Sequence, residues 1–387
     1  MRILVATTWF PSPGHPQVGA FVARDVAALA ARHEVRVVHL VAPHLATVGA
    51  SWRPEDLEDD ASRRPCVERG QDVVDGVQVL DLPGLDPVAV RVRRVVTDLR
   101  RPDHLVRAGR VVLGAARGAD VLHTAALSSL LPLAVRRVPV PWVHTEHWHG
   151  VSSTEGDPLP LRLATPALRR LLLRPDVVTA VSELATSPVR ALRGDRPSVV
   201  VPCLVPPPER VPARRAPGGR LRLVAVGGLV PGKRPLLAVE TLAALRDLGQ
   251  DAELTWVGAG PLRAEVATRA GALGVEVRLV GAAEAHEVAA ELARADVFLL
   301  PTRRETFGVA IAEALAHGRP VVTGGDGGFR EFVDDGVAAF VDTEDARSWA
   351  DAVLDVLDRT RGLSAAEIAA TLGDRFTPAR VREGYER

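Results

Sequence analysis

Residues 299–331 read LLPTRRETFGVAIAEALAHGRPVVTGGDGGFRE, and this stretch says most about the architecture of the chain. An apolar run ends at Pro301, and a helical pattern begins near Thr306 to Gly308. The next apolar run leads into a second glycine-rich turn at 324–328. In doubly wound α/β sheets the strand ends and the helix starts that follow them share one edge, where ligands bind. The stretch therefore predicts two neighbouring parallel strands and a binding site in their loops.

Two glutamates, Glu305 and Glu313, lie eight residues apart across this strand-to-helix junction. On a helix that begins near Thr306, Glu313 lies two turns in, on the same face as Thr306. We therefore expect Glu305 at the mouth of the site and Glu313 along its wall. The alternative is an ordinary helix with surface carboxylates.

A third strand end carries the only lysine of the chain. The segment VGGLVPGKRP, residues 226–235, places Lys233 just before a helix, and the other 47 of the 48 basic residues are arginines. An ammonium beside flexible glycine backbone is a strong partner for phosphate. The segment is not a P-loop, because Arg234 replaces the expected Ser or Thr. A solvated loop lysine is the alternative.

The whole chain alternates short apolar runs with helical patterns, which is typical of parallel sheets covered on both faces. Nearly half of its 387 residues are apolar, and the length suits two domains. A Pro- and Arg-rich stretch at 201–220 suits a linker. We predict an N-terminal domain at 1–205, a C-terminal domain at 206–372, and a tail at about 373–387 that packs back on the first domain.

The first half offers a glycine and a histidine segment. Gly19 stands at the start of the first helix, where it is a candidate amide cradle. The segment WVHTEHWHG places His144, His147 and His149 at a strand end. This spacing lacks a defined zinc pattern and HExxH is absent, so we expect no metal site and a polar wall with one histidine reaching a ligand.

Together these segments resemble the retaining glycosyltransferases of family 4, also called glycosyl transferases group 1. The resemblance covers nearly the whole chain. Its most specific part is the segment RETFGVAIAEALAHGRPVV followed by GGFREFV, which is similar to the family's E-x7-E signature and glycine loop. Three further segments stand in the expected order around it: VGAGPL, VRLVG and GVAAFVD. In the first half, Gly19, HTEH and AVSE are similar to the phosphate loop, the acceptor-side histidine and an interdomain serine. The resemblance implies a GT-B fold, two Rossmann-like domains facing across a cleft.

The resemblance also implies roles for residues. A nucleotide-diphosphate sugar, with UDP- and GDP-sugars favoured, would bind mainly to the C-terminal domain, and a hydroxyl-bearing acceptor to the N-terminal one. Catalytic roles fall to Glu305, His147 and Lys233. Sugar-donor contacts are expected from Gly19, Gly228, Lys233, Arg234, Val280, Thr306, Phe307, Gly308, Val309 and Glu313, and acceptor-side contacts from His144, His147, His149 and Ser182. No cofactor or metal ion is expected.

Two positions depart from the family pattern. An arginine usually accompanies the lysine in the family's GRL…K segment, and Gly228 stands at that place. Arg234 is a candidate substitute. The frequent PN dipeptide before the linker reads Pro202-Cys203, so any contact made by that asparagine is lost.

The predicted function is retaining transfer of a sugar to an acceptor hydroxyl, in a cell-envelope or lipid-linked glycan or a small natural product. Two alternatives stay open: a nucleotide-sugar epimerase on the same fold, which needs acid and base carboxylates on the acceptor side, and a non-catalytic nucleotide-sugar-binding partner. The sequence does not indicate which sugar, base, acceptor or linkage is used.

The formal charge of +0 and the pI of about 7.2 give no support for nucleic-acid binding. The two cysteines, Cys66 and Cys203, have no metal or redox spacing, and no apolar run is long enough to cross a bilayer. We expect a cytoplasmic protein of a bacterium. The segment 89–117 has eight arginines among Val and Leu, so peripheral contact with an anionic membrane at its inner face is one option and a solvated helix face the other.

Overall fold

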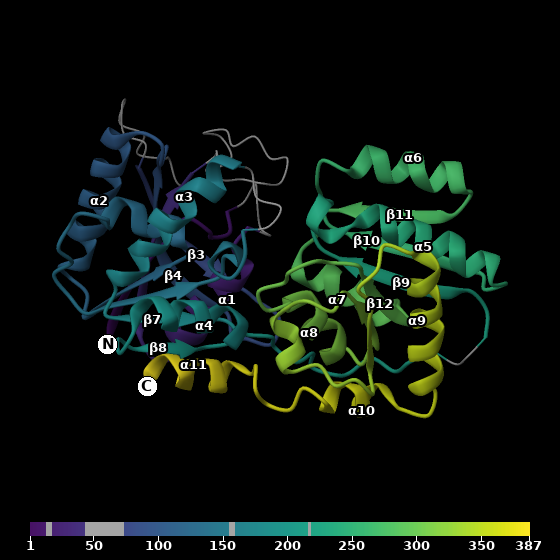
Figure 1. The fold of residues 1–387 in the computed structure, drawn as a ribbon. Coiled ribbons are helices and arrows are strands. Elements are labelled where there is room, and N and C mark those ends of the chain that lie inside the picture. Colours follow the sequence, from purple (N-terminus) through teal and green to yellow (C-terminus); the bar gives the residue numbers. More distant parts are fainter. Residues whose placement is uncertain (13–17, 43–72, 155–158, 216–217) are drawn as a thin grey trace. The chain divides into compact units, whose positions relative to one another are not determined.

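The computed structural model of the chain describes residues 1–12, 18–42, 73–154, 159–215 and 218–387. It divides into two compact α/β units, 1–204 with 378–387 and 205–377, here called unit 1 and unit 2 (Figure 1). Each unit has its own sheet, as the sequence pattern predicts. No helix among these residues is long and apolar enough to cross a membrane.

Unit 1 is built around a mostly parallel sheet. In the described residues the strand order is β3-β4-β2-β1-β5-β6-β7-β8. The strands are β1 Arg2–Thr7, β2 Glu34–Val41, β3 Val73–Leu80, β4 Val88–Val96, β5 Val121–Ala125, β6 Trp142–Glu146, β7 Val177–Ala180 and β8 Ser198–Val200. The helices are α1 Ala20–Ala30, α2 Pro102–Ala116, α3 Leu159–Arg169, α4 Glu183–Arg193 and α11 Pro378–Glu386, with 3-10 turns η3 Leu127–Leu133, η4 His149–Val151 and η5 Arg170–Leu173.

The core of unit 1 lies on both faces of this sheet. Because side chains alternate along a strand, β1 sends Leu4 and Ala6 into one apolar cluster and Ile3 and Val5 into the other. Helix α2 covers the first cluster and α1 the second. This two-sided burial explains why the central strands are nearly continuous apolar runs.

One edge of the sheet corrects the expectation of purely parallel strands. Strand β3 pairs with β4 in antiparallel fashion, whereas β4 is parallel to β2. The link at 81–87 contains no helix, and antiparallel neighbours need no crossover helix.

The Arg-rich segment 89–117 is also not one continuous surface. Its first half is strand β4, and Arg94 there is fully buried and donates to Gln78 at 2.6 Å. Arg93 and Arg100 form ion pairs with Asp75 and Asp98. Only the second half is helix, because Pro102 starts α2.

Unit 2 holds a parallel sheet in the order β11-β10-β9-β12-β13-β14, and Figure 1 shows helices α5, α7, α8 and α9 around β9 and β12. The strands are β9 Leu221–Val226, β10 Ala252–Val257, β11 Glu276–Gly281, β12 Val297–Leu300, β13 Val321–Thr323 and β14 Ala338–Phe340. The helices are α5 Pro235–Asp247, α6 Arg263–Leu273, α7 Ala285–Arg294, α8 Val309–Ala316, α9 Ala346–Arg359 and α10 Ala365–Ala370, with 3-10 turns η6 Pro231–Lys233 and η7 Gly328–Glu331. The central strands β12 and β13 are buried throughout, which matches their unbroken apolar sequence.

The end of the chain is shared between the units. Residues 373–377, which the sequence analysis assigned to the returning tail, belong to unit 2, because Phe376 packs edge-on against Phe307 and Phe332 there. Helix α11 returns to unit 1, where Val381 joins an apolar cluster with Val201 after β8 (Figure 1). Tyr385 on α11 donates a hydrogen bond to Asp25 on α1 at 2.9 Å.

Candidate functional site

The strand-end loops of unit 2 bring Lys233 and Glu305 together. Lys233 ends η6 after β9, and Glu305 follows β12, 72 residues later. Their side chains form an ion pair and are 27% and 17% exposed. The Thr302 hydroxyl donates to the same carboxylate oxygen at 2.8 Å. A cation and a carboxylate therefore lie side by side at the carboxyl edge of the sheet, still reachable from solvent.

The backbone around Glu305 is tightly constrained. Arg304, just before it, has a left-handed φ of 55°, a conformation that is costly for a side chain other than glycine. Gly328 donates its amide to the Glu305 carbonyl at 2.9 Å, and Glu305 and Gly327 form a parallel bridge. The loop after β13 thus holds the loop after β12, which places the two predicted turns in contact.

Gly308 caps α8 and needs to be glycine. Its φ is 91°, and an added Cβ would lie 3.2 Å from Ile311 and Phe329. The helix that follows points its first backbone amides toward this edge, as anion sites at helix starts do. Thr306 and Val309 flank the turn and are partly exposed. The Phe307 side chain is buried in the aromatic cluster, so only its backbone remains for a ligand contact.

Arg234 is a third charged group at this edge. It has a left-handed φ of 47°, and its guanidinium donates to the Pro301 carbonyl and, at 2.9 Å, to Glu344. Burial lowers the pKa of Arg234 to about 10, with the nearby charge of Arg303 as the second cause. Arg303 also pairs with Glu344. Two arginines and one lysine therefore gather where an anion is predicted to bind.

The remaining predicted sugar-donor residues of unit 2 lie on the same sheet, its helices or the loops between them. Glu313 is partly exposed on α8, and its backbone carbonyl accepts from His317 Nδ1 at 2.8 Å. Val280 is partly exposed on the edge strand β11. Gly228 follows β9, and a Cβ there would meet nothing nearer than 3.6 Å. That position has room for a side chain, whereas Gly308 does not.

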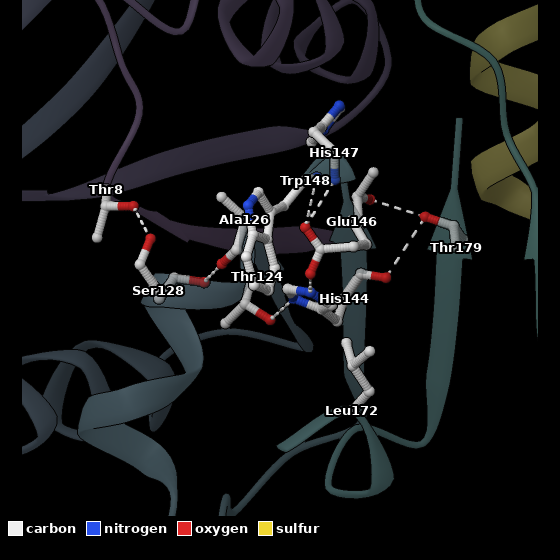
Figure 2. A network of polar contacts seen from close by, with 12 residues as sticks. Thr8, Thr124, Ala126, Ser128, His144, Glu146, His147, Trp148, Leu172 and Thr179 are labelled. Carbon is white, nitrogen blue, oxygen red and sulfur yellow. Dashed lines mark hydrogen bonds and ion pairs between the residues drawn. The ribbon is translucent and has the colours of Figure 1, made fainter. Parts of the chain in front are cut away.

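In unit 1, the histidine segment surrounds a buried glutamate that the sequence analysis did not single out. Glu146 ends β6 with 0% of its side chain exposed. One oxygen accepts the backbone amides of His147 and Trp148, both at 2.8 Å, and the other faces His144 Nε2 at 3.3 Å (Figure 2). The buried Glu146 side chain thus fixes the turn that carries His147. Its position inside the HTEH motif was the available signal.

His144 has a structural environment. It is fully buried, and its Nδ1 lies 3.0 Å from the Thr124 hydroxyl. Thr124 in turn accepts from Trp142 Nε1 at 2.9 Å. Both ring nitrogens of His144 therefore have a polar partner inside unit 1. This series of hydrogen bonds orders the interior of unit 1, and the His144 side chain is 0% exposed.

His147 and His149 lie nearer the surface than His144. The His147 ring is half-buried against Phe21 of α1, with ring centres 4.4 Å apart. Burial lowers the pKa of His147 to about 4, so its imidazole is neutral at pH 7. His149 begins η4 and is partly exposed beside Trp148.

Two further predicted residues of unit 1 have defined backbone roles. Ser182 is the N-cap of α4, and its side chain accepts a hydrogen bond from the Ala185 amide at 3.2 Å. This contact stabilises the start of the helix. Gly19 caps α1 with a φ of 69°, and an added Cβ would lie 2.3 Å from the Trp9 carbonyl carbon. The close approach of these two backbone segments requires glycine.

Unit 2 also contains a cavity of about 350 Å³ that is separate from these loops. It is lined by the early and middle residues of β9, β10 and β11 and by α7, among them Arg222, Glu253, Arg278 and Glu291. These charges pair with one another, Arg222 with Glu253 and Arg278 with Glu291. We assign the site to the strand-end loops, because the predicted residues gather there. In the described part of the chain no three His, Cys, Asp or Glu side chains are grouped to hold a metal ion.

Comparisons with known proteins identify the family. Residues 220–359 match the family described as glycosyl transferases group 1. The chain is 33% identical over 358 residues to the GDP-mannose-dependent alpha-(1-6)-phosphatidylinositol monomannoside mannosyltransferase of Mycolicibacterium smegmatis, covering 87% of each chain. It is 30% identical over 388 residues to the protein of the same name from Mycobacterium tuberculosis, covering 94% of this chain and 91% of that one.

The fold comparison agrees. Sucrose-phosphate synthase from Thermosynechococcus elongatus superimposes with a TM-score of 0.70 at 18% identity, covering 100% of this chain and 98% of that one. At this identity the likeness concerns the fold. The GT-B fold and the group 1 resemblance predicted from the sequence are thereby confirmed, and the chain belongs to the glycosyl transferases group 1 family as a glycosyltransferase.

Proposed function

We propose that the protein is a retaining glycosyltransferase of family 4 that moves a hexose from a nucleotide-diphosphate sugar to an acceptor hydroxyl. The observation that carries the proposal is the meeting of Lys233 and Glu305, from two separate strand-end loops, beside the start of α8. The relatives named above use GDP-mannose according to their names. GDP-mannose is therefore the first sugar donor to test, with UDP-sugars next.

Unit 2 would hold the sugar donor. Lys233 pairs with the diphosphate, the amides at Phe307 and Gly308 hold sugar and phosphate oxygens, and Glu313 accepts hydrogen bonds from the ribose. Arg234 is close enough to the loop after β12 to take the place of the arginine missing at position 228. Val280 borders the base. Without a ligand, Glu305 neutralises Lys233; bound diphosphate competes for that ammonium and leaves Glu305 to the sugar hydroxyls.

The reaction follows from where charge develops. Breaking the bond between C1 and the phosphate oxygen leaves positive charge on the sugar and negative charge on the diphosphate. Lys233 and the preorganised amides stabilise the diphosphate, and loss of one such contact typically costs about 2.7–4 kcal/mol of barrier. The acceptor oxygen forms the new bond on the same face, and its proton passes to the departing phosphate oxygen. No metal ion takes part in this scheme.

Unit 1 would bind the acceptor through the turn that Glu146 fixes. A neutral His147 can accept a hydrogen bond from an acceptor hydroxyl, which its low pKa favours. His149 and the backbone near Ser182 complete the acceptor side, whereas His144 supports it from the core.

The acceptor and location are part of the proposal. The names of the relatives specify phosphatidylinositol mannosides, which favours a lipid-linked or cell-envelope acceptor over a small natural product. We place the protein in the bacterial cytoplasm, peripheral on the inner face of the membrane.

Sugar-donor binding and turnover provide the test. GDP-mannose and a panel of UDP-, ADP- and dTDP-sugars are assayed by calorimetry and by slow hydrolysis without acceptor, with and without EDTA. We expect one sugar donor to bind selectively, and Lys233→Ala to lower turnover at least about a hundredfold. Glu313→Ala should weaken binding, whereas Glu265→Ala, on exposed α6, serves as the matched control.

The outcomes separate the candidate functions. If no nucleotide sugar binds to the wild type, the proposed sugar-donor site is wrong. Binding without turnover in the presence of lipid extracts favours a non-catalytic binding partner. Conversion of the sugar donor into an isomer without acceptor indicates an epimerase. Loss of activity with EDTA contradicts the metal-free scheme, and an inverted anomer in the product contradicts retention.

A further inference from the structure

Helix α3 is attached to unit 1 along one side only. Of its residues, all of which the structure describes, Thr165 alone is buried. Leu168 packs against the core cluster, and Arg169 donates to the Gly150 carbonyl at 2.7 and 3.2 Å. These three residues lie on one side of the helix. The opposite side faces solvent within unit 1.

That outward side is apolar. Leu159 and Leu163, one turn apart, are 64% and 73% exposed. Pro166 and Ala167 continue the same face and are also exposed. Leucines this accessible are costly in water, and an exposed apolar stripe on a helix commonly marks an interaction surface.

The surroundings of the stripe are cationic. Residues 159–174 contain four arginines and no Asp or Glu. Arg162 and Arg170 are exposed beside the leucines. At the end of η5, Arg174 donates to the Arg136 carbonyl at 2.6 Å, next to Val135, which is 93% exposed. Apolar and cationic groups are thus mixed on one face, hereafter the α3 surface: Leu159, Arg162, Leu163 and Arg170.

The exposed valines of strand β3 lack this charge pattern. On strand β3, Val77 and Val79 accompany Asp75, which pairs with Arg93. In the Arg-rich segment 89–117, Arg100 and Arg101 pair with acids, so much of its charge is neutralised locally. Within the described residues of α3 and η5, exposed leucines stand beside arginines and the segment contains no Asp or Glu.

We propose that the α3 surface docks unit 1 on an anionic lipid membrane. The leucines would enter the headgroup boundary and the arginines would meet lipid phosphates, as in interfacial amphipathic helices. This proposal rests on the proposed function only in that a lipid-linked acceptor gives the docking a purpose. The Arg169–Gly150 hydrogen bonds connect α3 to η4, the turn that begins at His149. Docking through α3 therefore holds the acceptor turn close to the membrane surface.

Vesicle flotation with the full-length chain tests the proposal. The vesicles are phosphatidylcholine alone, or phosphatidylcholine with about a third phosphatidylglycerol, at low and moderate salt. We expect binding to the anionic vesicles only. Leu159→Ser with Leu163→Ser should lower it about tenfold or more, and Arg162→Ser with Arg170→Ser should lower it and remove its salt dependence.

Two matched control variants locate the surface. Val77→Ser with Val79→Ser removes equally exposed apolar groups from β3, and Arg110→Ser with Arg117→Ser removes exposed charges from α2. Neither should change binding by more than about twofold. If the α2 variant releases the protein and the leucine variant does not, the Arg-rich segment docks and α3 does not. Equal binding of all variants overturns the proposal as well.

Two further readouts make the result specific. The leucine variant should hydrolyse the sugar donor in vesicle-free solution like the wild type, which shows that its fold is intact. If its mass by gel filtration falls while vesicle binding stays, α3 is an interface between copies and the membrane proposal is wrong. If the protein binds vesicles through α3 but processes no nucleotide sugar, the docking proposal is supported and the proposed function is refuted.

Discussion

Replacing Glu146 by alanine should destabilise unit 1 strongly. The fully buried carboxylate accepts two backbone amides at 2.8 Å and faces His144 (Figure 2). A buried hydrogen-bond donor left without its partner costs about 1–3 kcal/mol, and alanine would leave the two backbone amides and His144 Nε2 without theirs. We expect a loss of about 3–5 kcal/mol, a large part of the stability of an ordinary domain, which is about 5–15 kcal/mol.

Glu146→Gln is the informative comparison. The amide keeps an oxygen that can accept the His147 and Trp148 amides but presents an NH2 group in place of the oxygen that faces His144 Nε2. We expect a loss of about 1–2 kcal/mol. It should also affect acceptor use more than sugar-donor hydrolysis, because the turn of His147 belongs to the acceptor side.

Urea unfolding followed by tryptophan fluorescence measures the free energy of unfolding of both variants, since Trp142 and Trp148 flank Glu146 in the sequence. The KM values for acceptor and sugar donor complete the comparison. An alanine variant within about 1 kcal/mol of the wild type would refute the reasoning. So would a glutamine variant as unstable as alanine, because the backbone amides would then not be what the side chain stabilises.

Three other perturbations have defined outcomes. Burial raises the pKa of Asp25 to about 7, so the folded protein binds more protons than the unfolded protein between about pH 4 and 7. The free energy of unfolding should therefore fall by up to about 4 kcal/mol as pH rises through that window. Asp25→Asn should flatten this slope in unfolding curves, and an unchanged slope contradicts the assignment. Gly308→Ala should lower the free energy of unfolding by about 1–2 kcal/mol and raise the KM for sugar donor, because φ is 91° and the new Cβ crowds Phe329. An unchanged melting temperature and an unchanged KM would contradict this prediction. Gly228→Arg should fold normally and tighten nucleotide-sugar binding up to about tenfold by calorimetry, because the position has room for a side chain. Weaker binding would show that Arg234 already provides the arginine contact to the diphosphate.

Local sequence patterns were sufficient for most of the architecture. Strands such as β1 and β12 are runs of apolar residues, and the glycines and prolines that follow mark where each ends. Lys233 and Glu305 were singled out because a lone lysine and a signature glutamate follow such strands. The family pattern was readable for the same reason, since its residues stand at fixed distances along the chain.

Other features depended on contacts between distant residues. Strand β4 was hidden in an Arg-rich segment, because only its place beside β2 and β3 makes Arg94 a buried residue. The unit boundary near 377 was missed because Phe376 completes an aromatic cluster with residues more than 40 positions away. The alternation of Val and Arg over residues 90–93 was the available signal for β4, whereas the unit boundary has no periodic signal.

The sequence by itself determined most of the alternation of strands and helices, the two-domain plan and the identity of the charged loops, because periodicity and turn residues act over a few positions. The tertiary structure alone decided that Lys233 meets Glu305, that Glu146 fixes the turn of His147, and that α3 turns its leucines outward. Such pairings depend on how the sheet brings strand ends together. No local pattern specifies which distant side chain will occupy the neighbouring position.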